Sequence, residues 1–222
     1  MKLKIKITTL SDTLIGSGRT YGAVIDSDIE YDNYGMPYIP SKRIKGIFRD
    51  AANELLKMDG LNGLLGYELK DIDEIFGNIG STENGSYLKF DNLNIVEKEQ
   101  IAPWLDYLFL AYEYHFKDNI MQDFFTSIRN QTAIDKDKGI AKDGSLRTLR
   151  LLKEGFAFDG ELYIDNYQYD KKIKRMLAFI SLIIKRIGTQ RNRGFGKVDI
   201  DLYDEHGKSL KDELKRELED MI

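Results

Sequence analysis

The sequence predicts an α+β fold with a ferredoxin-like β-α-β-β-α-β core. An alternating strand pattern opens the chain, two amphipathic helix patterns lie far apart in it, and further strand patterns separate and follow them. Periods of two and of about 3.6 residues distinguish the strands from the helices. The six core elements are expected, in order, at residues 2–9, 41–58, 87–96, 156–164, 171–187 and 197–203.

The first strand and the two helices have the clearest patterns. Lysines alternate with aliphatic residues over 2–9, which is typical of a strand with one buried face. Ser41 is expected to N-cap the first helix, and Asp59-Gly60 to end it. Apolar residues recur at helical spacing: Ile44, Ile47, Phe48, Ala51, Ala52, Leu55 and Leu56 in the first helix, and Ile173, Met176, Leu177, Ile180, Ile183, Ile184 and Ile187 in the second.

The remaining sequence is expected to decorate this core. Glycine-rich and acidic residues at about 10–40 predict a long structured loop, and an aromatic-rich, then polar, segment fills about 100–150. A capping box at Ser209–Asp212 predicts a C-terminal helix over 209–222. We therefore expect a single domain over residues 1–222, because neither a linker nor an internal repeat interrupts the pattern.

The composition excludes several kinds of chemistry. The chain has no cysteine, which excludes disulfides, thiolate zinc sites and a cysteine nucleophile. Two histidines, His115 and His206, are too few for a multi-histidine metal site. The longest apolar run, Met176–Ile184, is too short to span a bilayer, so we expect a cytoplasmic protein without a membrane partner. The net charge of −4 requires that any nucleic-acid site be a local basic surface.

The glycine-rich segment Gly188–Gly196 is the first candidate site. Its glycines let the backbone approach a ligand closely, and its two arginines suit phosphate. The aromatic ring within it is expected to stack on a base or to pack in the core. The alternative is a helix C-cap followed by a tight turn. The candidate RNA-binding residues are Gly188, Arg191, Arg193, Gly194, Phe195 and Gly196.

The beginning of the first helix is the second candidate site. Cations there oppose the helix macrodipole, so they are favourable when an anion binds at the same place. The alternative is an ordinary solvated basic face. The candidate residues are Ser41, Lys42, Arg43, Lys45 and Arg49.

Two further segments carry charged candidates. The first is an acidic loop with a short strand expected around Val24–Tyr31; its Asp26, Asp28, Glu30 and Asp32 either bind Mg²⁺ or pair with nearby cations. The second is the polar segment 130–150, expected to be a long loop or a projecting β-hairpin that contacts a nucleic-acid backbone or a neighbouring subunit. Its flanks and interior contain the cations Arg129, Lys136, Lys138, Lys142, Arg147 and Arg150.

Four sequence blocks, taken in order, resemble the RAMP superfamily, the repeat-associated proteins of CRISPR systems. They cover nearly the whole chain. The blocks are Leu10–Gly18, Tyr38–Arg49, Thr132–Arg147 with Phe158–Glu161 after it, and Gly188–Gly196.

The resemblance implies a ferredoxin-like (RRM-like) fold in subunits that stack along CRISPR RNA with other effector subunits, and a thumb-like insertion that reaches the guide–target duplex. It implies that Lys142 and Arg147 also contact RNA. In type III complexes, such backbone subunits also cleave target RNA, using an acidic residue and a divalent metal such as Mg²⁺. Asp26 lies closest to that acidic position and would hold the metal, with Asp28 as the alternative.

Three functions follow from the resemblance. The first is a CRISPR RNA-binding backbone subunit that also cleaves target RNA by 2′-OH attack on the adjacent phosphate. The second is a non-catalytic structural or capping subunit of the same complex. The third is a free-standing ribonuclease that processes repeat RNA, which is disfavoured because both histidines lie outside the matching blocks. The first predicts that Lys42, Arg43, Lys45, Arg191 and Arg193 lie on one face.

Overall fold

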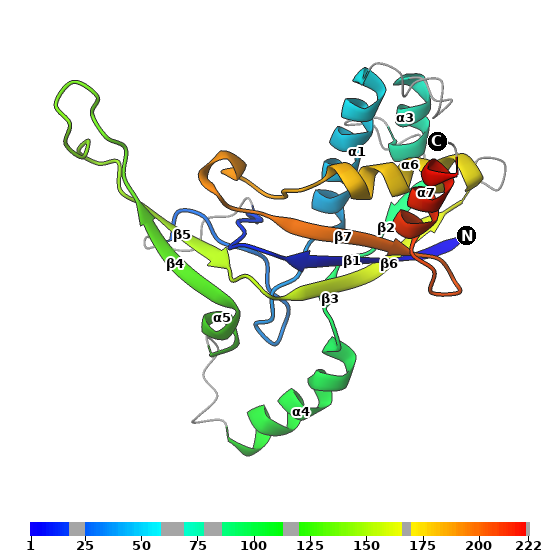
Figure 1. Ribbon diagram of the computed structural model, residues 1–222. Helices are drawn as coiled ribbons and strands as arrows, with labels where there is room; N and C mark the ends of the chain where they lie inside the picture. Colours follow the sequence, from blue (N-terminus) through cyan, green and yellow to red (C-terminus); the bar gives the residue numbers. More distant parts are fainter. Residues whose placement is uncertain (18–24, 59–68, 78–85, 113–119, 166–169, 221–222) are drawn as a thin grey trace.

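An antiparallel sheet with helices on one face forms the centre of the protein (Figure 1). The structure is a computed structural model that describes residues 1–17, 25–58, 69–77, 86–112, 120–165 and 170–220. The described elements are β1 (Lys2–Thr9), α1 (Ser41–Lys57), α3 (Leu69–Phe76), β2 (Leu88–Phe90), β3 (Asn94–Ile95), α4 (Lys98–Ala111), α5 (Ile120–Phe125), β4 (Thr126–Gln131), β5 (Arg147–Leu152), β6 (Ala157–Ile164), α6 (Asp170–Ile183), the 3₁₀ turn η1 (Arg191–Arg193), β7 (Val198–Tyr203) and α7 (Leu210–Glu219).

The sheet has the strand order expected of a ferredoxin-like core. The order is β2-β6-β1-β7, with β3 also paired to β6, and all pairs are antiparallel. In β1 the aliphatic residues Leu3, Ile5 and Ile7 are buried under α1 and α6, while the alternating lysines point to the opposite, open face. The predicted α+β class and β-α-β-β-α-β order are confirmed.

The predicted strand over 87–96 forms two short strands separated by a bulge. Phe90 pairs with Leu162 and Asn94 pairs with Asp159, so four residue steps from Phe90 to Asn94 lie opposite three steps on β6. The extra residue lets the backbone of Leu93 bridge Ile39, while its side chain lies against Gly160 of β6. This bulge connects the edge of the sheet to the chain that leads into α1.

Helix boundaries differ from the expectations at the start of α1 and at the end of α6. Pro40 is the N-cap of α1, and the hydroxyl of Ser41 forms no capping bond; Asn92 Oδ1 instead accepts the Ser41 N–H at 2.8 Å. The helix α6 ends at Ile183, and the apolar side chain of Ile187 continues into the core from the following loop. The predicted stop Asp59-Gly60 lies outside the described residues, whereas Ser209 caps α7 by accepting the Asp212 N–H, as predicted.

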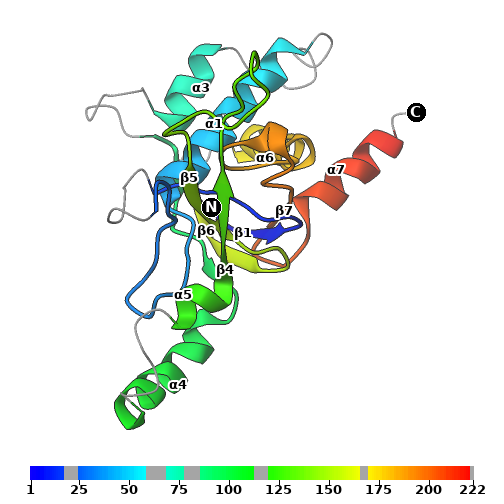
Figure 2. The same ribbon diagram turned by 90° about the vertical axis from the view of Figure 1, so that its left-hand side faces the viewer.

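The insertion at about 100–150 contains two helices and a hairpin. Its aromatic part forms α4 and α5, which sequence periodicity did not resolve, and its polar part forms the tip of the β4–β5 hairpin. Figures 1 and 2 place α4 beyond the open face of the sheet, on the side opposite α1 and α6. Within the described segments, no helix is both long and apolar enough to cross a membrane.

Candidate nucleic-acid interface

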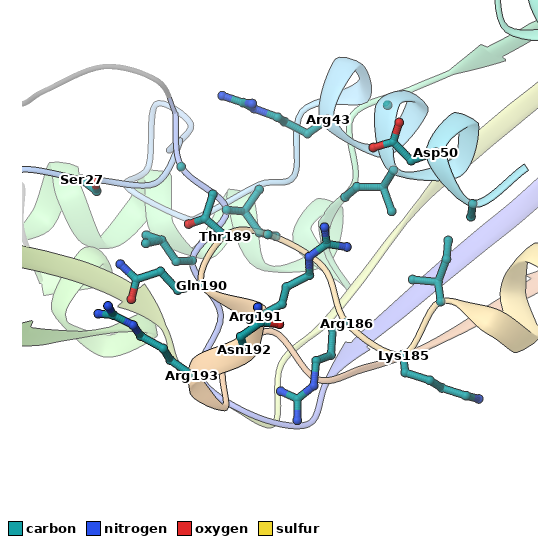
Figure 3. Close-up of a pocket in the computed structure, with 18 of the residues that line it drawn as sticks. Ser27, Arg43, Asp50, Lys185, Arg186, Thr189, Gln190, Arg191, Asn192 and Arg193 are labelled. Atoms are coloured by element: carbon teal, nitrogen blue, oxygen red, sulfur yellow. The ribbon is translucent and has the colours of Figure 1, made fainter. Parts of the chain in front are cut away.

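A depression of about 1320 Å³ lies between α1 and the glycine-rich loop (Figure 3). We call it the cationic groove. Six cations and four acids line it, and one of the acids, Asp28, is neutralised by Arg150 from outside the lining. Six cations therefore face three uncompensated acids, although the chain as a whole is acidic. The charged lining residues are Asp26, Asp28, Lys42, Arg43, Asp50, Glu54, Lys185, Arg186, Arg191 and Arg193.

One wall of the groove is the glycine-rich loop. Gly188 and Gly196 both have positive φ, and a Cβ at either would lie 2.3 Å or less from a backbone carbonyl oxygen. These two glycines are therefore needed to fold the loop against Leu14 and Ile187. Gly194 has positive φ but open space around it. The tight-turn interpretation thus explains two of the glycines, and the same turn presents the arginines of η1 to solvent.

The opposite wall is the first turns of α1. Lys42 and Arg43 are exposed, and within the described residues neither they nor Arg191 forms an ion pair. Figure 3 shows Arg43 and Asp50 on α1 above the loop that carries Arg191. Positive side chains separated by 148 residues in sequence (191 minus 43) therefore share one depression. Cations without ion-pair partners that line the same depression provide a surface for phosphate groups.

Two predicted cations of α1 do not line the groove. Arg49 donates to the Gly77 carbonyl at 2.7 Å and pairs with Asp73. Lys45 donates to Ser86 Oγ at 2.7 Å, and burial followed by the nearby Arg49 charge lowers its pKa. Lys45 and Arg49 lie at i and i+4, and both side chains turn to the segments at Ser86 and Gly77 instead of into the groove. Of the five cations expected on one face, Lys42, Arg43, Arg191 and Arg193 line the groove and Lys45 does not.

The two candidate acids have opposite environments. Asp28 is 2% exposed; it accepts from Tyr31 Oη and from its neighbour's backbone N–H, and it pairs with Arg150 at 3.1 Å. Asp26 is exposed, lines the groove, and accepts the Thr148 N–H at 2.7 Å through Oδ2. Asp28 is thus used within the fold, and Asp26 is the acid that a ligand in the groove meets.

Four remaining candidates lie outside the groove lining: Ser41, Phe195, Lys142 and Arg147. Phe195 is 4% exposed, and the guanidinium of Arg129 lies 5.2 Å from its ring centroid, so the ring packs in the core. Lys142 is on the hairpin tip and Arg147 begins β5; both are exposed on the projecting arm. Residues that the sequence analysis did not single out, Lys185 and Arg186, line the groove because the chain after α6 passes along it.

The described residues do not by themselves fit a divalent-metal site. Among them, no group of three or more acidic or histidine side chains is close enough to hold a metal ion. Mg²⁺ prefers six oxygen ligands. Asp26 offers one free carboxylate, whereas the oxygens of Asp28 are occupied by Ile29, Tyr31 and Arg150.

Comparison with known proteins identifies the family. The sequence model of the RAMP superfamily matches residues 6–199, which is most of the chain. The chain belongs to the RAMP superfamily. A search of curated proteins gave no match.

Solved structures share the RAMP fold. A subunit in a cryo-EM structure of the type III-B Cmr-beta bound to cognate target RNA is similar at a TM-score of 0.59 and 20% identity, over 90% of this chain and 60% of that chain. A subunit of the apo type III-B Cmr-beta is similar at a TM-score of 0.61 and 13% identity, over 92% of this chain and 98% of that one. This RAMP chain thus spans about three-fifths of the first of these subunits. The TM-scores show a common fold, and at such low identities they show the fold alone.

Proposed function

We propose that this RAMP chain is a CRISPR RNA-binding subunit of a type III effector complex. The observation that carries the proposal is the cationic groove, whose net positive lining contrasts with the acidic chain. Unpaired arginine and lysine side chains bind phosphate and release counterions, which favours RNA binding at moderate salt. The chain is similar to subunits in two structures of the type III-B Cmr-beta, and in one of these structures the Cmr-beta is bound to cognate target RNA. This similarity supports the same partners: CRISPR RNA, target RNA and other effector subunits.

Measured RNA affinity tests this proposal directly. Fluorescence anisotropy with a labelled single-stranded CRISPR RNA gives the Kd at several salt concentrations. Arg191→Ala is expected to weaken binding about 5- to 10-fold and to reduce the slope of log Kd against log salt by about one. Arg216→Ala on α7 removes the same charge far from the groove and serves as the matched control. Equal affinities for wild type and Arg191→Ala would contradict RNA binding in the groove.

Cleavage of target RNA is a second candidate function. The observation that favours it is the exposed carboxylate of Asp26, in the groove that also contains Arg43 and Arg191. In this proposal Asp26 takes the proton of a target 2′-OH, whose oxygen attacks the adjacent phosphorus. The bond to the 5′ oxygen breaks, leaving a 2′,3′-cyclic phosphate and, after protonation by water, a 5′-hydroxyl. The groove arginines stabilise the charge on the phosphate oxygens.

The isosteric Asp26→Asn variant separates the catalytic from the structural role. The assembled complex with bound CRISPR RNA is incubated with labelled target RNA, with Mg²⁺ or with EDTA. We expect Asp26→Asn to reduce the cleavage rate about 100-fold or more, with unchanged CRISPR RNA content. Unchanged cleavage would assign the chain to the non-catalytic structural or capping role instead. Dependence on a divalent cation stays a prediction that the EDTA arm checks.

A further inference from the structure

The last two rungs of the β4–β5 ladder before the projecting loop, called the hairpin base, contact two walls of the cationic groove: an acidic wall formed by residues 26–28, and the glycine-rich loop. On one wall, Thr148 donates its N–H to Asp26 Oδ2 at 2.7 Å and accepts the Asp26 N–H at 2.9 Å. On the other wall, Gln131 Oε1 accepts from Arg193 Nη1 at 2.9 Å. The strand register pairs Asn130 with Thr148 and Gln131 with Arg147. The two wall contacts therefore come from adjacent rungs of a single ladder.

The acidic wall is attached to the hairpin as a short third strand. Ser27 forms a parallel bridge with Leu149, and the Arg150 N–H donates to Ser27 O at 3.0 Å. Beneath this segment, the side chains of Arg150 and Asp28 form a buried ion pair. The Asp26 carboxylate is thus held relative to the hairpin by the hydrogen bonds that Asp26 and Ser27 form with β5, and by the ion pair between Asp28 and Arg150.

The loop wall docks on one face of β4. Side chains two residues apart on a strand point to the same side. Arg129 lies over the ring of Phe195, and two residues later Gln131 binds Arg193. Alternate residues of the strand therefore meet alternate residues of the glycine-rich loop, which fixes the register of one against the other.

We propose that Gln131 is a positioning residue for Arg193, and that the hairpin base fixes this arginine relative to Asp26. The inference rests on the proposed RNA-binding function. An arginine side chain loses rotamer entropy when it is ordered, so a guanidinium oriented before binding loses less entropy on contact with phosphate. The amide oxygen of Gln131 orients the guanidinium without neutralising it, which a carboxylate at the same place would do.

A double-mutant cycle on RNA affinity tests the coupling. The probe is a fluorescein-labelled single-stranded RNA oligonucleotide, and the variants of the full chain are Gln131→Met, Arg193→Ala and both together. Methionine keeps the length of the side chain and removes the acceptor. We expect Arg193→Ala to weaken binding about 5- to 10-fold and Gln131→Met about 3-fold. If Gln131 acts through Arg193, the double variant binds as Arg193→Ala does.

Controls separate positioning from a loss of structure. Ile128→Ala changes an exposed side chain on the other side of the same strand, outside the groove lining, and is expected to leave RNA affinity unchanged. A positioning role also predicts that Gln131→Met lowers the slope of log Kd against log salt, which a change in stability alone would not do. Thermal unfolding confirms that each variant is folded.

The outcomes distinguish this inference from the proposed function. Weaker binding by Arg193→Ala, with wild-type binding by Gln131→Met, overturns the positioning role and leaves RNA binding in place. Effects of the two substitutions that multiply in the double variant also overturn it, because Gln131 would then act independently. No effect of Arg193→Ala, with RNA binding by the wild type intact, overturns the positioning inference alone, whereas no RNA binding by the wild type overturns both together.

Discussion

The open face of the sheet and the cationic groove are both rich in charge, but they differ in how the charge is paired. On the open face, β1 presents three lysines, and its neighbours β6 and β7 present four carboxylates from directly opposite or diagonal positions. Lys2 pairs with Glu161 at 2.5 Å and Lys4 with Asp159 at 2.6 Å. In the groove, six cations face three uncompensated acids.

This difference explains why we propose that RNA binds in the groove and not on the open face of the sheet. Cross-strand pairs satisfy Lys2 and Lys4 within the fold, and Lys6 lies directly opposite Asp159 and Asp201, so an incoming phosphate would meet carboxylates already at short range. Helix α1 and the glycine-rich loop approach each other without supplying carboxylates that pair with Lys42, Arg43 or Arg191 in the described structure. The number of lysines on a surface therefore says less than whether their partners lie within reach.

The largest expected effect compares ion pairs beneath the groove and on the face. Arg150→Met leaves the buried charge of Asp28 without its partner, and we expect it to lower the free energy of unfolding by about 3–5 kcal/mol. Lys4→Met breaks the exposed pair with Asp159 and is expected to cost less than about 1 kcal/mol. Urea unfolding of both variants measures the two losses. Similar losses would show that burial does not distinguish the pairs.

One methyl group added to the glycine-rich loop is expected to lower the free energy of unfolding. Gly188→Ala places a Cβ 2.3 Å from the Leu14 carbonyl oxygen at positive φ, and it should cost about 3 kcal/mol of stability. Gly194→Ala has the same backbone strain in open space and should cost about 1 kcal/mol. Thermal unfolding of the pair measures the difference. Equal losses would indicate that the loop relaxes around the clash.

Equal charge removal from the two regions sharpens the comparison for RNA binding. We expect the groove variant to bind single-stranded RNA about 100-fold more weakly, and the face variant to stay within about 3-fold of wild type. Anisotropy titrations at one fixed salt concentration measure both. Comparable losses would place the RNA on the open face as well. The variants are Lys42→Ala/Arg43→Ala/Arg191→Ala in the groove and Lys2→Ala/Lys4→Ala/Lys6→Ala on the face.

The smallest expected effect concerns two tyrosines at alkaline pH: Tyr31, which donates to the groove residue Asp28, and Tyr163 in β6. Burial and the nearby Asp28 charge raise the pKa of Tyr31, and the hydrogen bond to Glu161 raises the pKa of Tyr163 to about 12. A tyrosine with a raised folded-state pKa stabilises the fold below its ordinary pKa of 10.0, and this contribution is lost as the pH rises above that value.

The slope of stability against pH measures this difference. Between pH 9 and about pH 11, Tyr31→Phe should flatten the fall in unfolding free energy more than Tyr163→Phe does, because solvent screens the Tyr163–Glu161 hydrogen bond, whereas burial sustains the raised pKa of Tyr31. The urea midpoint of each variant at several pH values gives the slope. A greater flattening by Tyr163→Phe would reverse the assignment of the buried phenol.

Local patterns were sufficient for the core but not for its irregular parts. The alternation in β1 and the apolar stripes of α1 and α6 depend on residues close in sequence, so their period predicts them. The split between β2 and β3 depends on the backbone of Leu93 bridging Ile39, a contact made only in the folded chain. The end of α6 at Ile183 was missed because Ile187 stays buried in the loop that follows.

The sequence by itself determined the order of the core elements, the family resemblance, and most of the groove cations, since each rests on a short run of residues. Only the tertiary structure decided which charges act together. It left Lys42 in the groove and engaged Lys45 with Ser86, buried Asp28 while leaving Asp26 exposed, and brought Gln131 to Arg193. The physical reason is that pairing and desolvation depend on neighbours supplied by distant segments, and no local period in the sequence encodes them.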